Sequence, residues 1–337
     1  MLEHGGKLRE AALNFKRPLA DWLDLSTGIN PHAYPVPTLR SDIWHRLPED
    51  DPALLAAAQS YYAAPQLLPI AGSQAAIAAL PRLRRALHGP ARVLAAATSY
   101  AEHAHHWSQH GHTLRQLNDA DLAEAMSAAE LPCDVLVICN PNNPTGTRIA
   151  PVQLLAWADL LAAHDGWLVV DEAFGDMQPE DSVASYSQRP GLIVLRSLGK
   201  FFGLAGVRLG FVAAASAILR ALADQLGPWA VSSAAQEIAC VALRDQAWQT
   251  TMRIDLAHAT HRLQTLLGRY GIASTGTDLF QWWRQAQAVQ LHHHMAQRGI
   301  WVRLFTHDGG ALRLGLPPDE AGWQRLDLAL GEWTDAA

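Results

Sequence analysis

One lysine of this sequence stands where its nitrogen chemistry, rather than its charge, is of use. Lys200 lies in the segment "SLGKFFGLAGVRLGF" (197–211), and lysine occurs elsewhere only at positions 7 and 16, although lysine and arginine together number 26. Lysine loses its proton more readily than arginine, and a free amine is a nucleophile. The pattern predicts a nucleophilic role for Lys200; the alternative is a surface lysine in a glycine-rich turn.

Two acidic residues end an apolar run. Asp171 and Glu172 follow the first residues of "WLVVDEAF" (167–174). A carboxylate at the end of a buried strand is costly unless it meets a cation or a strong donor. A metal ion and a protonated ring nitrogen are both candidates for that partner. A helix-capping role for Asp171 is a third interpretation.

A proline-rich turn presents two amide side chains. In "CNPNNPTG" (139–146), two X–Pro bonds and a terminal glycine fix the backbone after an apolar run. Asn142 and Asn143 can donate or accept hydrogen bonds from this rigid turn. The rigidity favours a ligand role over a plain turn.

A second turn joins an apolar strand end to a helix. The segment "IAGSQAAIAAL" (70–80) contains Gly72, Ser73 and Gln74. Ser73 is a suitable N-cap, and the first amides of the following helix would be available to hold a phosphate. Many strand-to-helix turns share this pattern without binding an anion.

Together these residue types meet the needs of one cofactor. A lysine can bond covalently to an aldehyde, and an aspartate can keep a pyridine nitrogen protonated. Ser197, Arg208 and a helix N-terminus can hold a phosphate. The order of these residues along one chain predicts a site for pyridoxal 5'-phosphate.

Regular alternation of apolar and amphipathic segments predicts the elements that position these residues. Buried strands are expected at 91–97, 134–140, 166–172 and 192–197. Helices are expected between them, at 73–88, 101–110, 119–130 and 151–164. This alternation predicts a mostly parallel sheet covered by helices on both faces, with ligands outside the carboxyl ends of the strands.

The pattern changes after about residue 225, where a long helical region gives way to short strands. This change predicts a smaller α+β domain. The first 40 residues are rich in proline and glycine and are expected to form an arm. The expected division is an N-terminal arm (1–40), a large cofactor-binding domain (41–225) and a small C-terminal domain (226–337).

Composition excludes several classes of partner. Of 337 residues, 49% are apolar and 17% charged, and the net charge of −6 leaves no basic surface for nucleic acid or a membrane. Cys133, Cys139 and Cys240 show no paired metal-ligand spacing and are interpreted as thiols of a reducing compartment. A cytoplasmic protein is expected.

Two histidine-rich stretches, 101–112 and 291–297, raise the possibility of a metal site. Neither carries the carboxylate and cysteine set of a structural zinc site. Both are interpreted as solvated helix faces, and no metal is expected.

The chain resembles the class I and II aminotransferases, pyridoxal-phosphate enzymes of fold type I, from about residue 20 to the C-terminus. The motifs "NPNNPTG", "DEAF" and "SLGKFFGLAGVRLGF" carry the resemblance. It implies an α/β fold with a mostly parallel sheet in the large domain and a smaller α+β C-terminal domain. It also implies a homodimer.

The resemblance implies a role for each motif residue. Lys200 would bond to the cofactor and move a proton, Asp171 would pair with the pyridine nitrogen, and Tyr100 would stack on the ring. Further cofactor contacts are implied for Gly72, Ser73, Gln74, Asn143, Ser197 and Arg208. Arg313 would bind the substrate carboxylate bidentately. A tyrosine donated across the dimer interface would be Tyr62, with Tyr61 as the fallback.

Two positions depart from the family pattern. Phe174 stands where many aminotransferases have tyrosine, and Gly199 where a serine is common. Both departures weaken the prediction of a simple aminotransferase.

The N-terminal segments "EHGG" (3–6) and "LDLSTGINP" (23–31) are similar to the arm of one branch of this family. That branch decarboxylates O-phospho-L-threonine, a phosphorylated amino acid, for cobalamin biosynthesis. Substrate contacts are implied for His4, Gly5, Asn30 and Asn143. The alternatives are a histidinol-phosphate aminotransferase and a non-catalytic regulator of the same fold; such regulators often lack the lysine.

Overall fold

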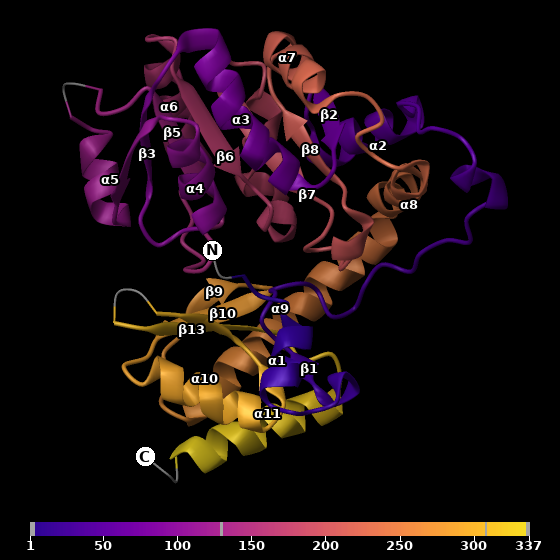
Figure 1. Ribbon diagram of the computed structural model, residues 1–337, viewed down its shortest axis with the longest axis vertical. Helices are drawn as coiled ribbons and strands as arrows, with labels where there is room; N and C mark the ends of the chain where they lie inside the picture. Colours follow the sequence, from indigo (N-terminus) through magenta and orange to yellow (C-terminus); the bar gives the residue numbers. More distant parts are fainter. Residues whose placement is uncertain (1–3, 129–130, 307–308, 335–337) are drawn as a thin grey trace. The chain divides into compact units, whose positions relative to one another are not determined.

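The computed structural model describes residues 4–128, 131–306 and 309–334, and the chain divides into two compact units (Figure 1). The sheet unit comprises residues 34–143 and 147–248. The terminal unit combines the first 33 residues with residues 144–146 and 249–337. Each unit has its own sheet.

The sheet unit is built on seven strands in the order β2–β8–β7–β6–β5–β3–β4. Strands β3 to β7 run parallel to their neighbours, whereas β8 is antiparallel to both β7 and β2. The bounds are β2 (Leu67–Ile70), β3 (Arg92–Ala96), β4 (Thr113–Leu117), β5 (Val135–Cys139), β6 (Trp167–Asp171), β7 (Leu192–Ser197) and β8 (Gly210–Ala213). The predicted mostly parallel α/β sheet is confirmed, as are its four predicted strands.

Helices cover the sheet as the alternation predicts. The helices between and beside the strands are α2 (Pro52–Tyr62), α3 (Ser73–His88), α4 (Ala101–Gln109), α5 (Asp119–Ala125), α6 (Pro151–Ala162), α7 (Ser216–Leu226) and α8 (Ser233–Arg244). Alternate strand residues, among them Val137, Val169 and Leu195, share one core with α3, α4 and α7 (Figure 1). Successive side chains of a strand point to opposite faces, so Asp171 and Ser197 belong to this same face.

The sequence pattern did not predict strands β4 and β8, and of β2 it predicted only the end, at Ile70. Strand β4 is an edge strand with no fully buried residue, so it lacks the continuous apolar run that identifies buried parallel strands. Strand β2 is the opposite edge and contains Pro69, which is tolerated there because proline has no N–H to donate.

A buried ion cluster lies on the other face of the sheet. Arg196 Nη1 lies 2.5 Å from Glu172 Oε2, and Arg196 Nη2 lies 2.7 Å from Asp176 Oδ1. All three side chains are at most 2% exposed. Ser182 Oγ and the Val183 amide also donate to Glu172. Burial would raise the pKa of Glu172, and these donors oppose that shift.

The terminal unit contains a four-stranded antiparallel sheet in the order β12–β13–β10–β9 and a short parallel pair, β1 with β11. The strands are β1 (Leu23–Asp24), β9 (Thr275–Thr277), β10 (Phe280–Arg284), β11 (Ile300–Trp301), β12 (Arg303–Phe305) and β13 (Ala311–Gly315). The helices are α1 (Leu8–Asn14), most of α9 (Gln246–Arg269), α10 (Ala288–Gln297) and α11 (Glu320–Thr334).

The two units differ in extent from the three expected domains. The first 33 residues are part of the terminal unit, where residues 8–14 form α1 and Leu23 pairs with Ile300. Helix α8 belongs to the sheet unit rather than to the small C-terminal domain, because it packs on α2. Among residues 4–128, 131–306 and 309–334, no helix is long and apolar enough to cross a lipid bilayer.

Candidate functional site

Asp171 ends β6 and is bound to a histidine that the motif analysis did not identify. Asp171 Oδ2 lies 2.9 Å from His103 Nε2, and Oδ1 accepts from the Ala173 amide at 3.0 Å. His103 comes from α4, on the face of the sheet that Asp171 occupies, and both side chains are 5% exposed. The carboxylate therefore has the strong donors that its burial requires.

The charge state of His103 follows from its partners. Burial alone would lower the pKa of His103, but hydrogen bonds to Asp171 and Cys139 raise it to about 10. The imidazole is therefore protonated at neutral pH and faces the Asp171 carboxylate. The carboxylate has more lone pairs than His103 and the Ala173 amide use, so it can accept a further hydrogen bond.

His103, Cys139 and Asp171 also form the one group within the described residues that is compact enough to hold a metal ion. In this arrangement the His103 Nε2 that a metal would need donates to Asp171 instead. The geometry is that of a hydrogen-bonded relay behind Asp171.

The interpretation of the histidine-rich stretches as solvated helix faces holds for His105 and His293, which are exposed, but is wrong for other histidines. His103 and His112 are buried, and His112 bonds through both ring nitrogens to the Ala91 amide and the Pro81 carbonyl. In α10 each of three histidines contacts an aromatic ring. These pairs are His292 with Trp301, His293 with Phe15 and His294 with Trp333.

Lys200 lies three residues after the end of β7. Its Nζ lies 5.4 Å from the centre of the Phe174 ring, which follows Asp171 by three residues. The preceding Gly199 packs so closely that a Cβ there would lie 3.0 Å from the Ala205 Cα. This contact explains why glycine stands where serine is common in the family.

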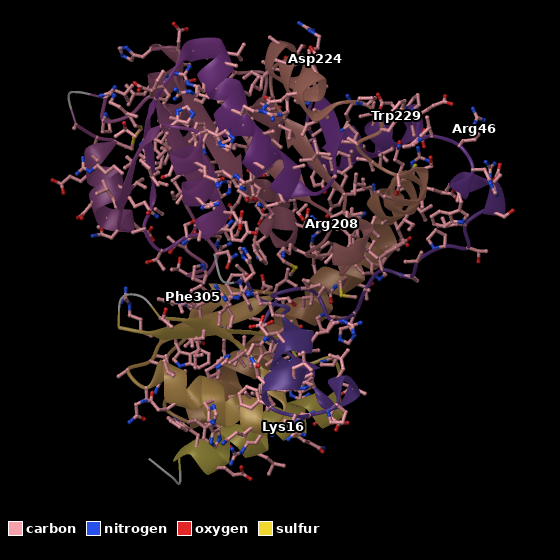
Figure 2. The ribbon with its side chains drawn as sticks, in the orientation of Figure 1. Lys16, Arg46, Arg208, Asp224, Trp229 and Phe305 are labelled. Atoms are coloured by element: carbon pink, nitrogen blue, oxygen red, sulfur yellow. The ribbon has the colours of Figure 1, made fainter. Side chains whose placement is uncertain are left out.

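A cradle for an anion forms where β2, β8 and α3 meet. Gly72 has a φ of +76°, and a Cβ there would lie 2.6 Å from Arg208 Nη2. A Cβ at Gly210 would lie 2.9 Å from the Ser73 amide nitrogen. The two glycines thus allow the exposed Arg208 guanidinium, which is labelled in Figure 2, to lie close to the first amides of α3. Helix N-terminal amides and a guanidinium are both ligands of phosphate.

The proline-rich turn is held by its own asparagines. Asn142 Nδ2 donates to the Thr98 carbonyl at 2.7 Å, and its Oδ1 accepts from Ser99 Oγ at 2.8 Å. Asn140 makes two hydrogen bonds to the backbone of Ile149, and the Asn140–Pro141 peptide is cis. Asn142 therefore braces the turn to the loop before Tyr100, and the half-buried Asn143 remains the candidate for ligand contact.

The structure distinguishes the two tyrosines proposed for an intersubunit role. Tyr62 is 5% exposed and packs on Arg196 and Phe211, and its burial raises its pKa. Tyr61 is partly exposed. A side chain donated to another subunit must leave its own core, so burial favours Tyr61 over Tyr62.

Four of the expected substrate residues, His4, Gly5, Asn30 and Arg313, lie in the terminal unit, whereas Asn143 lies in the sheet unit. Ser26 joins the N-terminal segment to Arg313. Arg313 Nη2 donates to the Ser26 carbonyl at 2.5 Å, and the Gly6 amide donates to Ser26 Oγ at 2.7 Å. A Cβ at Gly5 would lie 2.4 Å from that same carbonyl oxygen. The segment that begins at His4 is therefore docked beside Arg313. Asn30 is buried, and its Oδ1 accepts from the His32 amide.

Strand pairing reveals another arginine that the motifs did not identify. Arg303 on β12 stands directly opposite Arg313 on β13. Cross-strand partners share one face of a sheet, and like charges placed so are destabilising unless a counter-charge lies between them. Two guanidinium groups in this register suit a ligand with more than one negative charge.

The residues of the sheet unit fit pyridoxal 5'-phosphate. The fit rests on the cradle that a Cβ at Gly72 would fill, on the lysine at the end of β7, and on the buried carboxylate of Asp171. Lys200 would bond to the aldehyde, Asp171 would face the ring nitrogen, and Ser73, Ser197 and Arg208 would hold the phosphate.

Comparisons with known proteins agree with this fit. A family model described as aminotransferase class I and II matches residues 36–326. The threonine-phosphate decarboxylase of Pseudomonas aeruginosa is 51% identical, and the match covers 98% of this chain and 97% of that protein. The enzyme of the same name from a Sinorhizobium species is 40% identical, with 97% of each chain covered. The solved histidinol-phosphate aminotransferase of Sinorhizobium meliloti, in complex with pyridoxal-5'-phosphate, superposes with a TM-score of 0.81. It is 19% identical, and the superposition covers 99% of this chain and 96% of that one.

The His103–Asp171 pair makes stability depend on pH in a defined direction. The folded-state pKa of His103, about 10, lies above its ordinary value of 6.5. Its stabilisation is therefore fully present below pH 6.5 and is lost as the pH rises through about 10. We expect the difference in free energy of unfolding between wild type and His103→Gln, from urea titrations, to be largest near pH 6 and to shrink toward pH 10. His105→Gln, an exposed position of the same helix, should show no such trend; an equal trend there would contradict the assignment.

Proposed function

The chain belongs to the aminotransferase class I and II family, and we propose that it is a lyase that decarboxylates O-phospho-L-threonine. The product is (R)-1-amino-2-propanol O-2-phosphate, an intermediate of cobalamin biosynthesis, and the cofactor is pyridoxal 5'-phosphate. The observation that carries the proposal is the 51% identity, over 98% of this chain, to a protein named threonine-phosphate decarboxylase. A non-catalytic regulator is disfavoured because Lys200 is present at the end of β7.

The cofactor, when bound, supplies an electron-withdrawing ring that accepts the electron pair of the broken bond. The Asp171 carboxylate would face the ring nitrogen, and His103 holds that carboxylate in position. Lys200 Nζ provides the nucleophilic amine and, after carbon dioxide leaves, delivers a proton to the substrate Cα. The Cα–carboxylate bond breaks and a Cα–H bond forms, so the charge balances.

The substrate carries a carboxylate and a phosphate, and the terminal unit offers two facing arginines. Arg313 binds the α-carboxylate, and Arg303, opposite it on β12, supplies the second cationic group. His4 and Gly5 are docked through Ser26 beside Arg313 and complete the substrate side together with Asn30. A dianionic substrate offsets the repulsion between the two arginines.

A homodimer is part of the proposal. Large apolar side chains are exposed on α8, just before it, and on the segment that leads to Glu49. Gln236 of α8 binds the end of that segment through hydrogen bonds to the backbone of Glu49 and Asp51. The exposed apolar side chains are Val36, Trp44, Leu47, Trp229 and Val241, each 43% exposed or more. Figure 2 shows Trp229 and Arg46 pointing outward at the same edge of the sheet unit in this view. Free thiols at the three cysteines are consistent with a cytoplasmic enzyme.

The central experiment measures carbon dioxide release from O-phospho-L-threonine with cofactor and without a 2-oxo acid. We expect steady release from the wild type and a loss of several orders of magnitude in Lys200→Ala, because that variant has no amine to react. Turnover that appears only with 2-oxoglutarate and histidinol phosphate would instead identify a histidinol-phosphate aminotransferase.

Arg303 gives a second expectation. Replacing it by glutamine removes one charge-assisted contact to a dianionic substrate, so the KM should rise about tenfold to a hundredfold while cofactor affinity is unchanged. Arg269→Gln, an exposed arginine of the same unit, is the control. Equal KM values in the wild type and Arg303→Gln would remove Arg303 from substrate binding.

The exposed apolar side chains on and near α8 lead to a third prediction, which concerns the homodimer. Light scattering should report a mass of about twice the 36.7 kDa chain for the wild type. Trp44→Asp should dissociate the dimer, since a charge at the centre of an apolar contact is costly to desolvate. Leu328→Asp on α11, equally exposed at 68%, is the control. A monomeric wild type, or a dimer unaffected by Trp44→Asp, would contradict this surface.

A further inference from the structure

Four polar side chains form a continuous hydrogen-bonded chain that begins at Tyr100. Tyr100 Oη donates to Gln74 Oε1 at 3.2 Å, and Gln74 Nε2 donates to Glu102 Oε2 at 2.6 Å. The same carboxylate oxygen lies 3.2 Å from His106 Nε2. The side chains of Glu102 and His106 are only 12% and 18% exposed. These contacts are therefore largely shielded from water.

The carboxylate determines the direction of every hydrogen bond in this chain. An ionised carboxylate only accepts, whereas an amide has one accepting and one donating end. Glu102 therefore turns the NH₂ end of Gln74 toward itself and leaves the carbonyl end for Tyr100. His106 Nε2 lies 3.2 Å from this carboxylate and 3.5 Å from Gln74 Nε2, and the shorter contact favours a proton on Nε2 that is donated to Glu102.

The rest of the His106 ring agrees with that assignment. Its Nδ1 is buried and finds no hydrogen-bond partner among the described residues, as expected of a nitrogen without a proton. Burial lowers the pKa of His106, although Glu102 acts in the opposite direction, so the ring is neutral at neutral pH.

The hydroxyl of Tyr100 is held as a hydrogen-bond donor to Gln74. Burial, with Glu102 and Asp171 adding to it, raises the pKa of Tyr100 to about 12. The phenol keeps its proton and points it toward Gln74. If the amide of Gln74 were reversed, its NH₂ group would face the phenol, and Tyr100 would have to change its orientation to accept instead.

The chain also joins two helix starts that border the cradle. Gln74 lies in the first turn of α3, next to Ser73, and Tyr100 immediately precedes α4, whose first turn contains Glu102. The Glu102 carboxylate thus links Tyr100, which is expected to stack on the cofactor ring, to α3, whose first amides are expected to hold the cofactor phosphate.

We propose that Glu102 is a positioning residue for the cofactor. Its carboxylate orients the amide of Gln74 and, through that amide, holds Tyr100 and the start of α3 in the arrangement that receives pyridoxal 5'-phosphate. The inference rests on the proposed function only in assuming that pyridoxal 5'-phosphate is the ligand of the sheet unit.

The test compares Glu102→Gln with the wild type in cofactor binding, without substrate. The variant keeps the size of the side chain but can itself donate, so Gln74 is no longer forced into one orientation. We expect the Kd for pyridoxal 5'-phosphate to rise about tenfold, as the loss of one charge-assisted hydrogen bond implies. The induced circular dichroism of the bound cofactor should fall. Glu124→Gln, an exposed position on α5, should change neither.

Two further variants separate positioning from a general loss of structure. Glu102→Asp keeps the charge and should recover most of the dichroism signal. In a Tyr100→Phe background there is no phenol to orient, so Glu102→Gln should weaken binding less than it does in the wild type. Equal effects in both backgrounds, or unchanged binding in Glu102→Gln, would overturn the inference. A wild type that binds the cofactor but releases no carbon dioxide would overturn the proposed function and leave this inference in place.

Discussion

The buried ion cluster around Arg196 is the constraint on which the geometry of the site depends. Arg196 bridges Glu172 and Asp176 at the ends of β6 and β7, with all three side chains almost fully buried. Charges this deep are tolerated only when each has its partners, so the strand ends have little freedom to shift. Asp171 and Ser197 adjoin Glu172 and Arg196 in sequence and point to the opposite face. The cluster therefore limits the movement of Asp171 and Ser197, the two residues proposed to face the cofactor, while it remains on the other side of the sheet.

On the face of the sheet that carries Asp171, closely packed backbone segments shape the cradle for an anion. Glycine at positions 72 and 210 leaves room for the Arg208 guanidinium and for the first amides of α3. Hydrogen bonds from His103 to Asp171 and from Asn142 to Thr98 then attach α4 and the proline-rich turn to the strand ends. Each polar side chain at this edge thus has a partner that orients it, which is the preorganisation that a cofactor enzyme requires.

Most of the expected cofactor residues belong to the sheet unit, and the expected substrate residues other than Asn143 belong to the terminal unit. Ser26 connects the N-terminal segment to Arg313 through its hydroxyl and its carbonyl. The register of β12 with β13 places Arg303 opposite Arg313. The proposed substrate side therefore depends on contacts between residues nearly 290 positions apart, such as Ser26 and Arg313, whereas the proposed cofactor residues follow strand ends of one sheet.

The sequence by itself determined the buried strands, the helices between them and the edge at which Lys200, Asp171 and Asn143 gather. Apolar runs and turn residues are local signals, and the carboxyl ends of parallel strands meet at one edge. Only the tertiary structure decided which side chains meet there. The pairing of His103 with Asp171, the burial of Tyr62, the histidines packed on aromatic rings in α10 and the register of Arg303 all depend on contacts across elements. Local patterns cannot encode such contacts, because the same helix periodicity or strand alternation is compatible with many registers and partners.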